Sequence, residues 1–223
     1  MRRLSEDVFQ IPVVPRDGVN TYLVGDVLVD AGTRFSAKKI LGELTGHPVS
    51  THVITHAHVD HAGGTRQVAA ALDVPVWVGE LDAADVESGH PVAPAHNPLP
   101  TALSNAVGAF PSAHVDRRLV EGDEVGPGFV VLVTPGHSNG HISLWRESDR
   151  TLICGDVINT MHLITTKPGL QEPPKLFTTD PVRNRESIRR IAALEPQLTL
   201  AGHGPPVHGP EALRAFAASL PAG

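Results

Sequence analysis

The sequence feature that most restricts the fold of this chain is a series of short apolar segments, each of which runs into a histidine or an aspartate. Four such segments, rich in Val, Ile, Leu and Thr, are predicted β-strands: 49–55, 129–134, 151–154 and 198–201. The ligand-type side chains that follow them are His56, His137, Asp156 and His203. Loops at strand ends can converge while a sheet holds them rigid. The pattern therefore predicts that four strand ends meet at one site.

The first of these strand ends carries the densest cluster of polar side chains, in the stretch His56-Ala57-His58-Val59-Asp60-His61. Three imidazoles and one carboxylate within six residues exceed what a helix, strand or turn requires. A solvated histidine-rich loop is the alternative, and the ligand-type side chains at the three later strand ends argue against it. A catalytic zinc ion uses about three protein ligands and a water molecule, so seven ligands suffice for two ions that share one carboxylate. The seven are His56, His58, Asp60, His61, His137, Asp156 and His203.

The segments between the predicted strands have helical spacing or turn residues, which is typical of a layered α/β fold. Residues 20–30 are predicted to form a β-hairpin, and 33–45 a helix. Thr65 is predicted to cap a helix ending at Leu72, and Asp180 to cap another over 181–194. The other predicted elements are strands at 74–78, 118–120 and 142–146 and an amphipathic helix at 211–220. We expect residues 1–223 to form one domain.

Two proline-containing segments, 80–116 and 157–179, lack a clear period. Long irregular segments between strands commonly carry function, so we expect both to face the substrate. Within them we predict a helix over 101–109 and substrate contacts from Asn159 and His162.

Composition excludes several classes of protein. The net charge is −6 and no Lys/Arg-rich stripe is visible, which disfavours a nucleic-acid partner. No apolar run approaches the ~20 residues of a membrane span, and the first residues do not resemble a signal peptide. The single cysteine, Cys154, cannot form an internal disulfide and is expected in the core. We therefore expect a cytoplasmic monomer or homodimer with a small-molecule substrate and no membrane partner.

The motifs resemble those of the metallo-β-lactamase superfamily. The similarity comprises the entry motif that ends at Asp30, the His-x-His-x-Asp-His run from His56, the Thr-Pro-Gly-His-Ser-x-Gly-His run at 134–141, Gly-Asp at 155–156 and Gly-His-Gly at 202–204. It extends from about residue 22 to 203. The resemblance implies an αββα sandwich, a four-layer α/β fold of two mixed sheets flanked by helices, with a dinuclear metal site at one edge.

The resemblance also implies a role for each ligand. His56, His58 and His137 would hold one ion, Asp60, His61 and His203 the other, and Asp156 would bridge them. Asp30 and His141 would orient ligands from outside the coordination sphere. The expected cofactor is a pair of divalent ions, Zn²⁺ foremost, with Mn²⁺ or Fe²⁺ as alternatives because the same ligands accept several metals.

The implied activity is hydrolysis of a small ester, thioester or lactone by a metal-bridging hydroxide, with Asp60 as the proton carrier. A bridging aspartate at 156 disfavours a true β-lactamase, and residues 157–163 lack the glutathione-binding pattern of glyoxalase II. The same residues also lack the tyrosine that lactonases often place there. Three alternatives stay open: a phosphotriesterase-like or β-lactam hydrolase, a mononuclear iron persulfide dioxygenase, and a non-catalytic metal-binding regulatory protein. Most of the remaining histidines are expected at the surface or in loops, His47 and His52 are expected to have no functional role, and both tryptophans are expected in the core.

Overall fold

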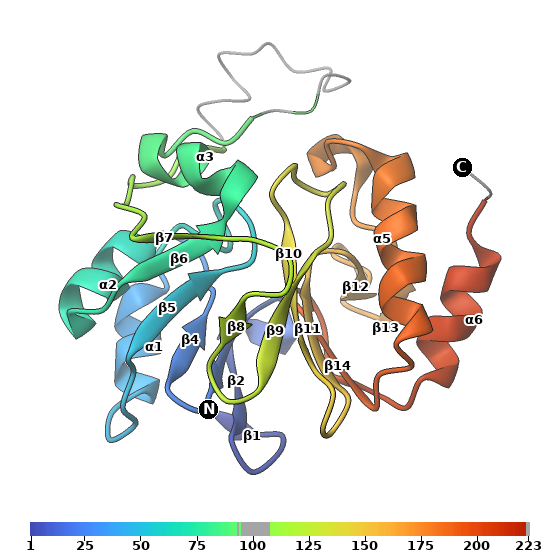
Figure 1. The fold of residues 1–223 in the computed structure, drawn as a ribbon, viewed down its shortest axis with the longest axis horizontal. Helices are drawn as coiled ribbons and strands as arrows, with labels where there is room; N and C mark the ends of the chain where they lie inside the picture. Colours follow the sequence, from blue (N-terminus) through green and yellow to red (C-terminus); the bar gives the residue numbers. More distant parts are fainter. Residues whose placement is uncertain (93, 95–107, 222–223) are drawn as a thin grey trace.

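Two β-sheets lie face to face at the centre of the molecule, and helices cover the outer face of each (Figure 1). This arrangement is seen in a computed structural model, which describes residues 1–92, 94 and 108–221. It is the αββα sandwich that the sequence motifs implied, with mixed strand directions in both sheets.

The first sheet has seven strands in chain order. They are β1 (Arg2–Arg3), β2 (Val8–Val14), β3 (Val19–Val24), β4 (Val27–Val29), β5 (Thr51–Ile54), β6 (Val76–Gly79) and β7 (Arg117–Leu119). Strands β1 to β4 pair antiparallel, whereas β4 to β7 are parallel. The carboxyl ends of β4, β5 and β6 therefore open onto one edge of the sheet.

The second sheet has six strands in the order β15-β14-β11-β10-β9-β8. Their bounds are β8 (Glu124–Val125), β9 (Phe129–Val133), β10 (Ile142–Arg146), β11 (Thr151–Gly155), β14 (Leu198–Ala201) and β15 (Val207–His208). Only β11 and β14 pair in parallel. A separate hairpin of β12 (Asn159–Met161) and β13 (Pro168–Gln171) follows β11.

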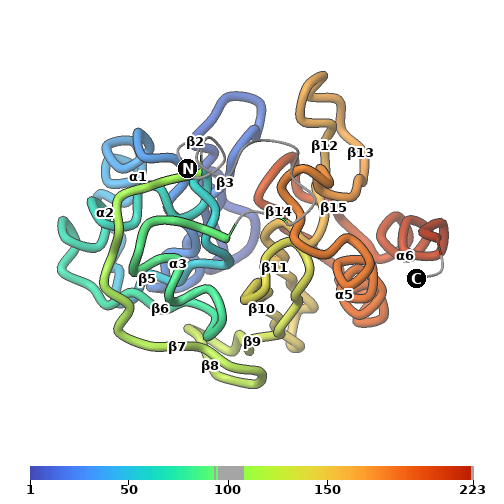
Figure 2. The backbone as a smooth tube through the Cα atoms, turned by 90° about the horizontal axis from the view of Figure 1, so that it is seen from above, coloured from blue at the N-terminus to red at the C-terminus, as the bar shows by residue number. Residues whose placement is uncertain are grey.

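The helices form the two outer layers. On the first sheet lie α1 (Ala37–Glu43), α2 (Thr65–Leu72) and α3 (Ala83–Ser88), and on the second lie α5 (Pro181–Ala193) and α6 (Glu211–Ser219) (Figures 1 and 2). Short 3-10 turns are η1 (Pro15–Asp17), η2 (Glu80–Asp82) and η3 (Lys175–Phe177). In the described part of the chain, no helix has the length and apolar character needed to cross a bilayer.

Three apolar layers hold these elements together. Between the sheets, side chains such as Val29 and Val53 of the first pack with Leu144 and Ile153 of the second. Outside the first sheet, Leu28 belongs to the cluster that includes helical residues of α1 and α2, and α5 and α6 contribute to the corresponding cluster on the second. Burial of apolar area stabilises such layers by roughly 25 cal/mol per Å². Two rigid sheets thus present their loops at a common edge.

Several sequence predictions are confirmed. The hairpin at 20–30 is β3 and β4, and the strands predicted at 142–146 and 198–201 are β10 and β14. Asp180 caps α5, because its side chain accepts hydrogen bonds from the backbone of Val182 and Arg183. Cys154 is fully buried, as expected of a small core residue.

Other predictions were wrong or incomplete. Thr65 is the first residue of α2 and not its cap, since its hydroxyl bonds to His52 instead. Helix α1 begins only at Ala37, because the hydroxyl groups of Thr33 and Ser36 bond to local backbone and to each other and form a turn. The segment 157–179 is less irregular than predicted, because it contains the β12–β13 hairpin. The helix predicted over 101–109 lies, apart from its last two residues, outside the described residues.

Candidate metal centre

All seven candidate ligands come together at the edge where the two sheets open. His56, His58, Asp60 and His61 lie on the loop between β5 and α2. The other three arrive from the second sheet: His137 from the β9–β10 loop, Asp156 after β11 and His203 after β14.

The ligand atoms form three overlapping groups whose members lie within 4.8 Å of one another. These groups are His56, His58 and His137; His56, His61 and Asp156; and Asp60, His61 and His203. Asp156 is central: one of its oxygens is 3.0 Å from His203 Nε2 and 3.5 Å from His137 Nε2, and the other is 3.4 Å from His61 Nε2. The first and third groups contain the residues that the resemblance assigns to separate ions, and ligation itself stays a prediction.

Hydrogen bonds to one ring nitrogen decide which nitrogen each imidazole presents to the centre. Nδ1 of His61 donates to Asp30 at 2.8 Å, and Nδ1 of His203 donates to the carbonyl of Gly18 at 2.6 Å. The corresponding atoms of His56 and His137 lie within 3.0 and 3.2 Å of threonine hydroxyls, those of Thr55 and Thr178. These four rings therefore offer Nε2. His58 differs, because its Nδ1 lies 2.9 Å from His137 Nε2.

Burial and neighbouring charges set the protonation of the centre. Burial, together with adjacent imidazoles, holds the pKa of His56 and of His137 well below the usual range, so both rings are neutral. Burial also opposes ionisation of Asp156, but His203 and His61 outweigh it and hold the pKa of that carboxyl well below its usual value. Burial opposes protonation of His61 and His203, but Asp156 outweighs it, so the pKa of His61 is raised and that of His203 is raised to about 10. An incoming cation would displace protons from these two rings.

The donor set fits a divalent metal ion. Nε2 of His56, Nε2 of His61 and Oδ1 of Asp156 are buried and have no hydrogen-bond partner among the described residues. Buried polar atoms normally have partners, and a cation between these three would supply one. Imidazole nitrogen and carboxylate oxygen suit zinc, iron or manganese. The centre can therefore hold divalent metal ions.

Both residues predicted to orient ligands are in contact with them. The carboxylate of Asp30 accepts from His61 and also from the backbone N–H and hydroxyl of Thr55. His141 is buried, its Nε2 accepts the backbone N–H of Asp156 at 3.1 Å, and its Nδ1 lies 2.9 Å from the hydroxyl of Thr134. Burial lowers the pKa of His141 to about 3, so it stays neutral and can accept this bond.

The two residues predicted to contact substrate lie in the β12–β13 hairpin. Asn159 is buried in β12, with Oδ1 unpartnered among the described residues. His162 uses Nδ1 to accept the backbone N–H groups of Ile164 and Thr165, which closes the turn of the hairpin. Both lie on the segment that follows Asp156, and their contact with substrate stays a prediction.

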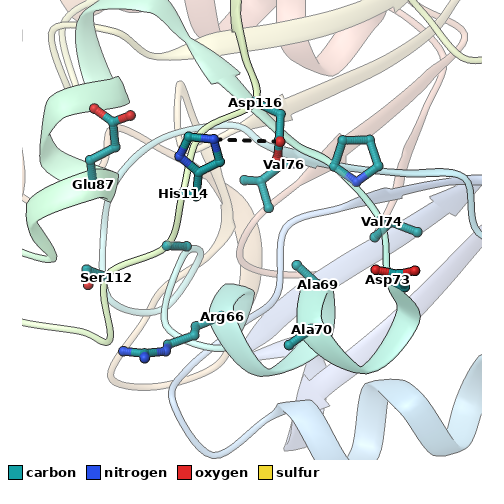
Figure 3. Close-up of a pocket in the computed structure, with 12 residues that line it drawn as sticks. Arg66, Ala69, Ala70, Asp73, Val74, Val76, Glu87, Ser112, His114 and Asp116 are labelled. Carbon is teal, nitrogen blue, oxygen red and sulfur yellow. Dashed lines mark hydrogen bonds and ion pairs between the residues drawn. The ribbon is translucent and has the colours of Figure 1, made fainter.

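A separate pocket of about 790 Å³ lies between α2, α3 and the segment before β7 (Figure 3). Its polar lining includes Arg66, Glu87, His114 and Asp116, with both signs of charge. None of the seven candidate ligands lines it. The convergent ligands therefore favour the sheet edge, and not this pocket, as the reactive centre.

The sequence is similar to those of a known protein family. Residues 14–203 match the family model described as the metallo-β-lactamase superfamily. The chain belongs to this superfamily.

Relatives within the superfamily include a probable metallo-hydrolase, YflN, of Bacillus subtilis strain 168. It is 32% identical over 206 residues, which covers 82% of this chain and 76% of YflN. A crystal structure of TTHA1623 in a di-iron-bound form has a TM-score of 0.72 and 29% identity, and covers 96% of this chain and 98% of that one.

Two relatives with more specific names match over shorter spans. A hydroxyacylglutathione hydrolase of Bdellovibrio bacteriovorus is 30% identical over 65% of this chain and 45% of its own length. An N-acyl homoserine lactonase of Bacillus thuringiensis is 30% identical over 62% of this chain and 48% of its own length.

The sequence motifs of the superfamily did not indicate the groups that hold His137 and His203. Thr178 reaches His137 from the segment before α5, and the carbonyl of Gly18 reaches His203 from the turn after η1. A threonine and a backbone carbonyl carry no sequence signal for this role. Only Thr55, which directly precedes His56, could have been proposed from its position.

Proposed function

We propose that this member of the superfamily is a hydrolase that uses two divalent metal ions to cleave a small ester, thioester or lactone. The observation that carries the proposal is the central position of Asp156, within 3.5 Å of histidines from three different loops. Such a carboxylate can be shared by two ligand groups. Two ions bound there would lower the pKa of water towards neutrality and polarise a carbonyl oxygen.

Asp60 is the side chain best placed to accept a proton. Its side chain is 34% exposed, whereas that of Asp156 is 6% exposed, so a water molecule or substrate can reach Asp60. Although burial opposes ionisation, the imidazoles of His203 and His61 lower the pKa of Asp60, which keeps it an acceptor at neutral pH. Oδ2 of Asp60 lies 3.3 Å from Nε2 of His203, and this contact orients the Asp60 carboxylate.

The relatives and the position of the single tyrosine support the proposed substrate class. A thioester-related hydrolase and a lactonase by name are both similar to this chain. The only tyrosine, Tyr22, is buried and donates its hydroxyl to the carbonyl of Ala201, so no phenol is available to the substrate. We therefore place simple esters and thioesters ahead of lactones.

The test combines metal analysis with a substrate screen. Metal content of the purified protein is measured, the metal is removed, and Zn²⁺, Mn²⁺ or Fe²⁺ is restored before assays on esters, thioesters, lactones, phosphotriesters and β-lactams. We expect about two ions per chain and metal-dependent cleavage of an ester or thioester, with none in the His203→Ala variant. Failure of every restored sample would contradict the proposal. One iron per chain with oxygen uptake on a persulfide would instead establish a dioxygenase.

A further inference from the structure

A buried carboxylate outside the metal centre connects the two loops that carry His56, His58 and His137. Asp82 is 1% exposed and lies at the end of η2, in the position that precedes α3. Aspartate at such a position usually caps its own helix. The Asp82 side chain makes no capping bond to α3 and is directed elsewhere.

Both oxygens of Asp82 are used by the ligand loops. Oδ2 accepts the backbone N–H of Ala57, between His56 and His58, at 2.9 Å, and the hydroxyl of Ser138, next to His137, at 2.6 Å. Oδ1 accepts the backbone N–H of Gly140 at 2.6 Å. One side chain thus bonds to a loop of the first sheet and to a loop of the second.

The backbones are in close contact at the same point. A Cβ atom on Gly140 would lie 2.2 Å from the backbone nitrogen of Asp82, and one on Gly79 would lie 2.0 Å from the carbonyl oxygen of Gly140. Glycine at both positions permits this approach. The Asp82 carboxylate therefore sits in a fixed, tightly packed junction between the sheets.

We propose that Asp82 is a positioning residue that sets the distance between His137 and the pair His56 and His58, and so determines affinity for the metal ion that these three would hold. The distance between the two ligand loops affects this group directly, because Nδ1 of His58 on one loop and Nε2 of His137 on the other lie only 2.9 Å apart. Asp60, His61 and His203, the third group, have no hydrogen bond to Asp82 in the part of the chain that the structure describes. This inference rests on the proposed metal-dependent function.

The Asp82→Asn variant tests the proposal with little change of shape. Whichever way the amide is turned, either Ala57 or Gly140 loses the acceptor of its backbone N–H group. Asp116→Asn is the control, because the exposed Asp116 also accepts a backbone N–H, that of Val76 at 2.8 Å, but has no hydrogen bond to a loop that carries candidate ligands.

The metal-free protein is titrated with Co²⁺, and binding is monitored by absorption. The free energy of unfolding of each variant is measured separately in chelator. The His203→Ala variant identifies which binding step belongs to which group. We expect the step at His56, His58 and His137 to weaken about tenfold or more in Asp82→Asn, as for other outer partners of metal ligands. The other step, and both steps in Asp116→Asn, should keep wild-type affinity.

Equal weakening of both steps, or no weakening, would overturn the proposal. If Asp82→Asn does not fold, Ser138→Ala removes one of the three bonds and must weaken the same step alone. A wild-type protein that binds Co²⁺ but cleaves no substrate would contradict the proposed hydrolysis and leave the role of Asp82 in metal binding intact.

Discussion

Oδ2 of Asp30 lies 2.8 Å from Nδ1 of His61, and this contact turns Nε2 of His61 toward Asp156. Asp30 occupies a left-handed backbone conformation, with φ of 62°, which aspartate and asparagine tolerate better than most residues. It also accepts the backbone N–H of Thr55 through Oδ1. One carboxylate thus orients a candidate ligand and the loop that carries the others.

The Asp30→Asn variant is expected to bind metal about 10–100-fold more weakly, because outer partners of metal-bound histidines typically contribute that much. An amide can serve His61 or Thr55 as acceptor but not both. The dissociation constant is measured by competition with a chelator. Asp26→Asn, in the turn between β3 and β4, is the control, and equal affinities for the two variants would refute the role of Asp30.

Asp60→Asn is expected to reduce kcat by about 10²–10⁴, the usual contribution of general acid–base catalysis. The group of His56, His58 and His137 should retain its ion. Turnover and metal content are measured on the same sample, with Asp73→Asn at the end of α2 as the control. If kcat falls only in proportion to lost metal, Asp60 acts as a ligand and not as the proton carrier.

Removal of metal is expected to lower the free energy of unfolding, because a ligand that binds only the folded state stabilises it. At free metal about 100 times the dissociation constant, the difference is about 2.7 kcal/mol per site. Urea denaturation with metal and with chelator measures it. The His137→Ala variant should show a smaller difference, and a midpoint independent of metal in the wild type would argue against a structural effect of binding.

The pH dependence of stability should change in the His52→Asn variant. His52 is fully buried, Nδ1 donates to the carbonyl of Leu28 at 3.1 Å, and Nε2 lies 3.0 Å from the Thr65 hydroxyl. Burial lowers the pKa of His52 from 6.5, so the unfolded chain takes up a proton more readily than the folded one. Its stabilising effect is therefore present above pH 6.5 and declines as the pH falls below that value.

The free energy of unfolding is measured in chelator at pH 7.5 and pH 5 for the wild type and for His52→Asn. The destabilisation caused by the substitution should be smaller at pH 5. The control is the His208→Asn variant, in which an exposed histidine is replaced. Its free energy of unfolding should equal that of the wild type at each pH. The same difference between wild type and His52→Asn at both pH values would show that His52 is not the titrating group.

Much of the fold was predictable because local pattern and tertiary structure agree. Apolar β-branched runs became strands β9, β10, β11 and β14, and Asp180 with Pro181 marked the start of α5. Prediction failed where a side chain bonds to a distant partner and not to its own segment. Thr65 bonds to His52, 13 residues away. Asp82, for which the sequence predicted no role, bonds to loops 25 and 56 residues away.

The sequence by itself determined the chemistry of the candidate centre, because ligand types and their spacing are written in four short stretches around His56, His137, Asp156 and His203. Tertiary structure decided which nitrogen each ring presents and that Asp82 connects the loops of both sheets. The physical reason is that hydrogen-bond partners of a buried group are set by packing between sheets, and packing brings together residues whose separation in sequence carries no signal.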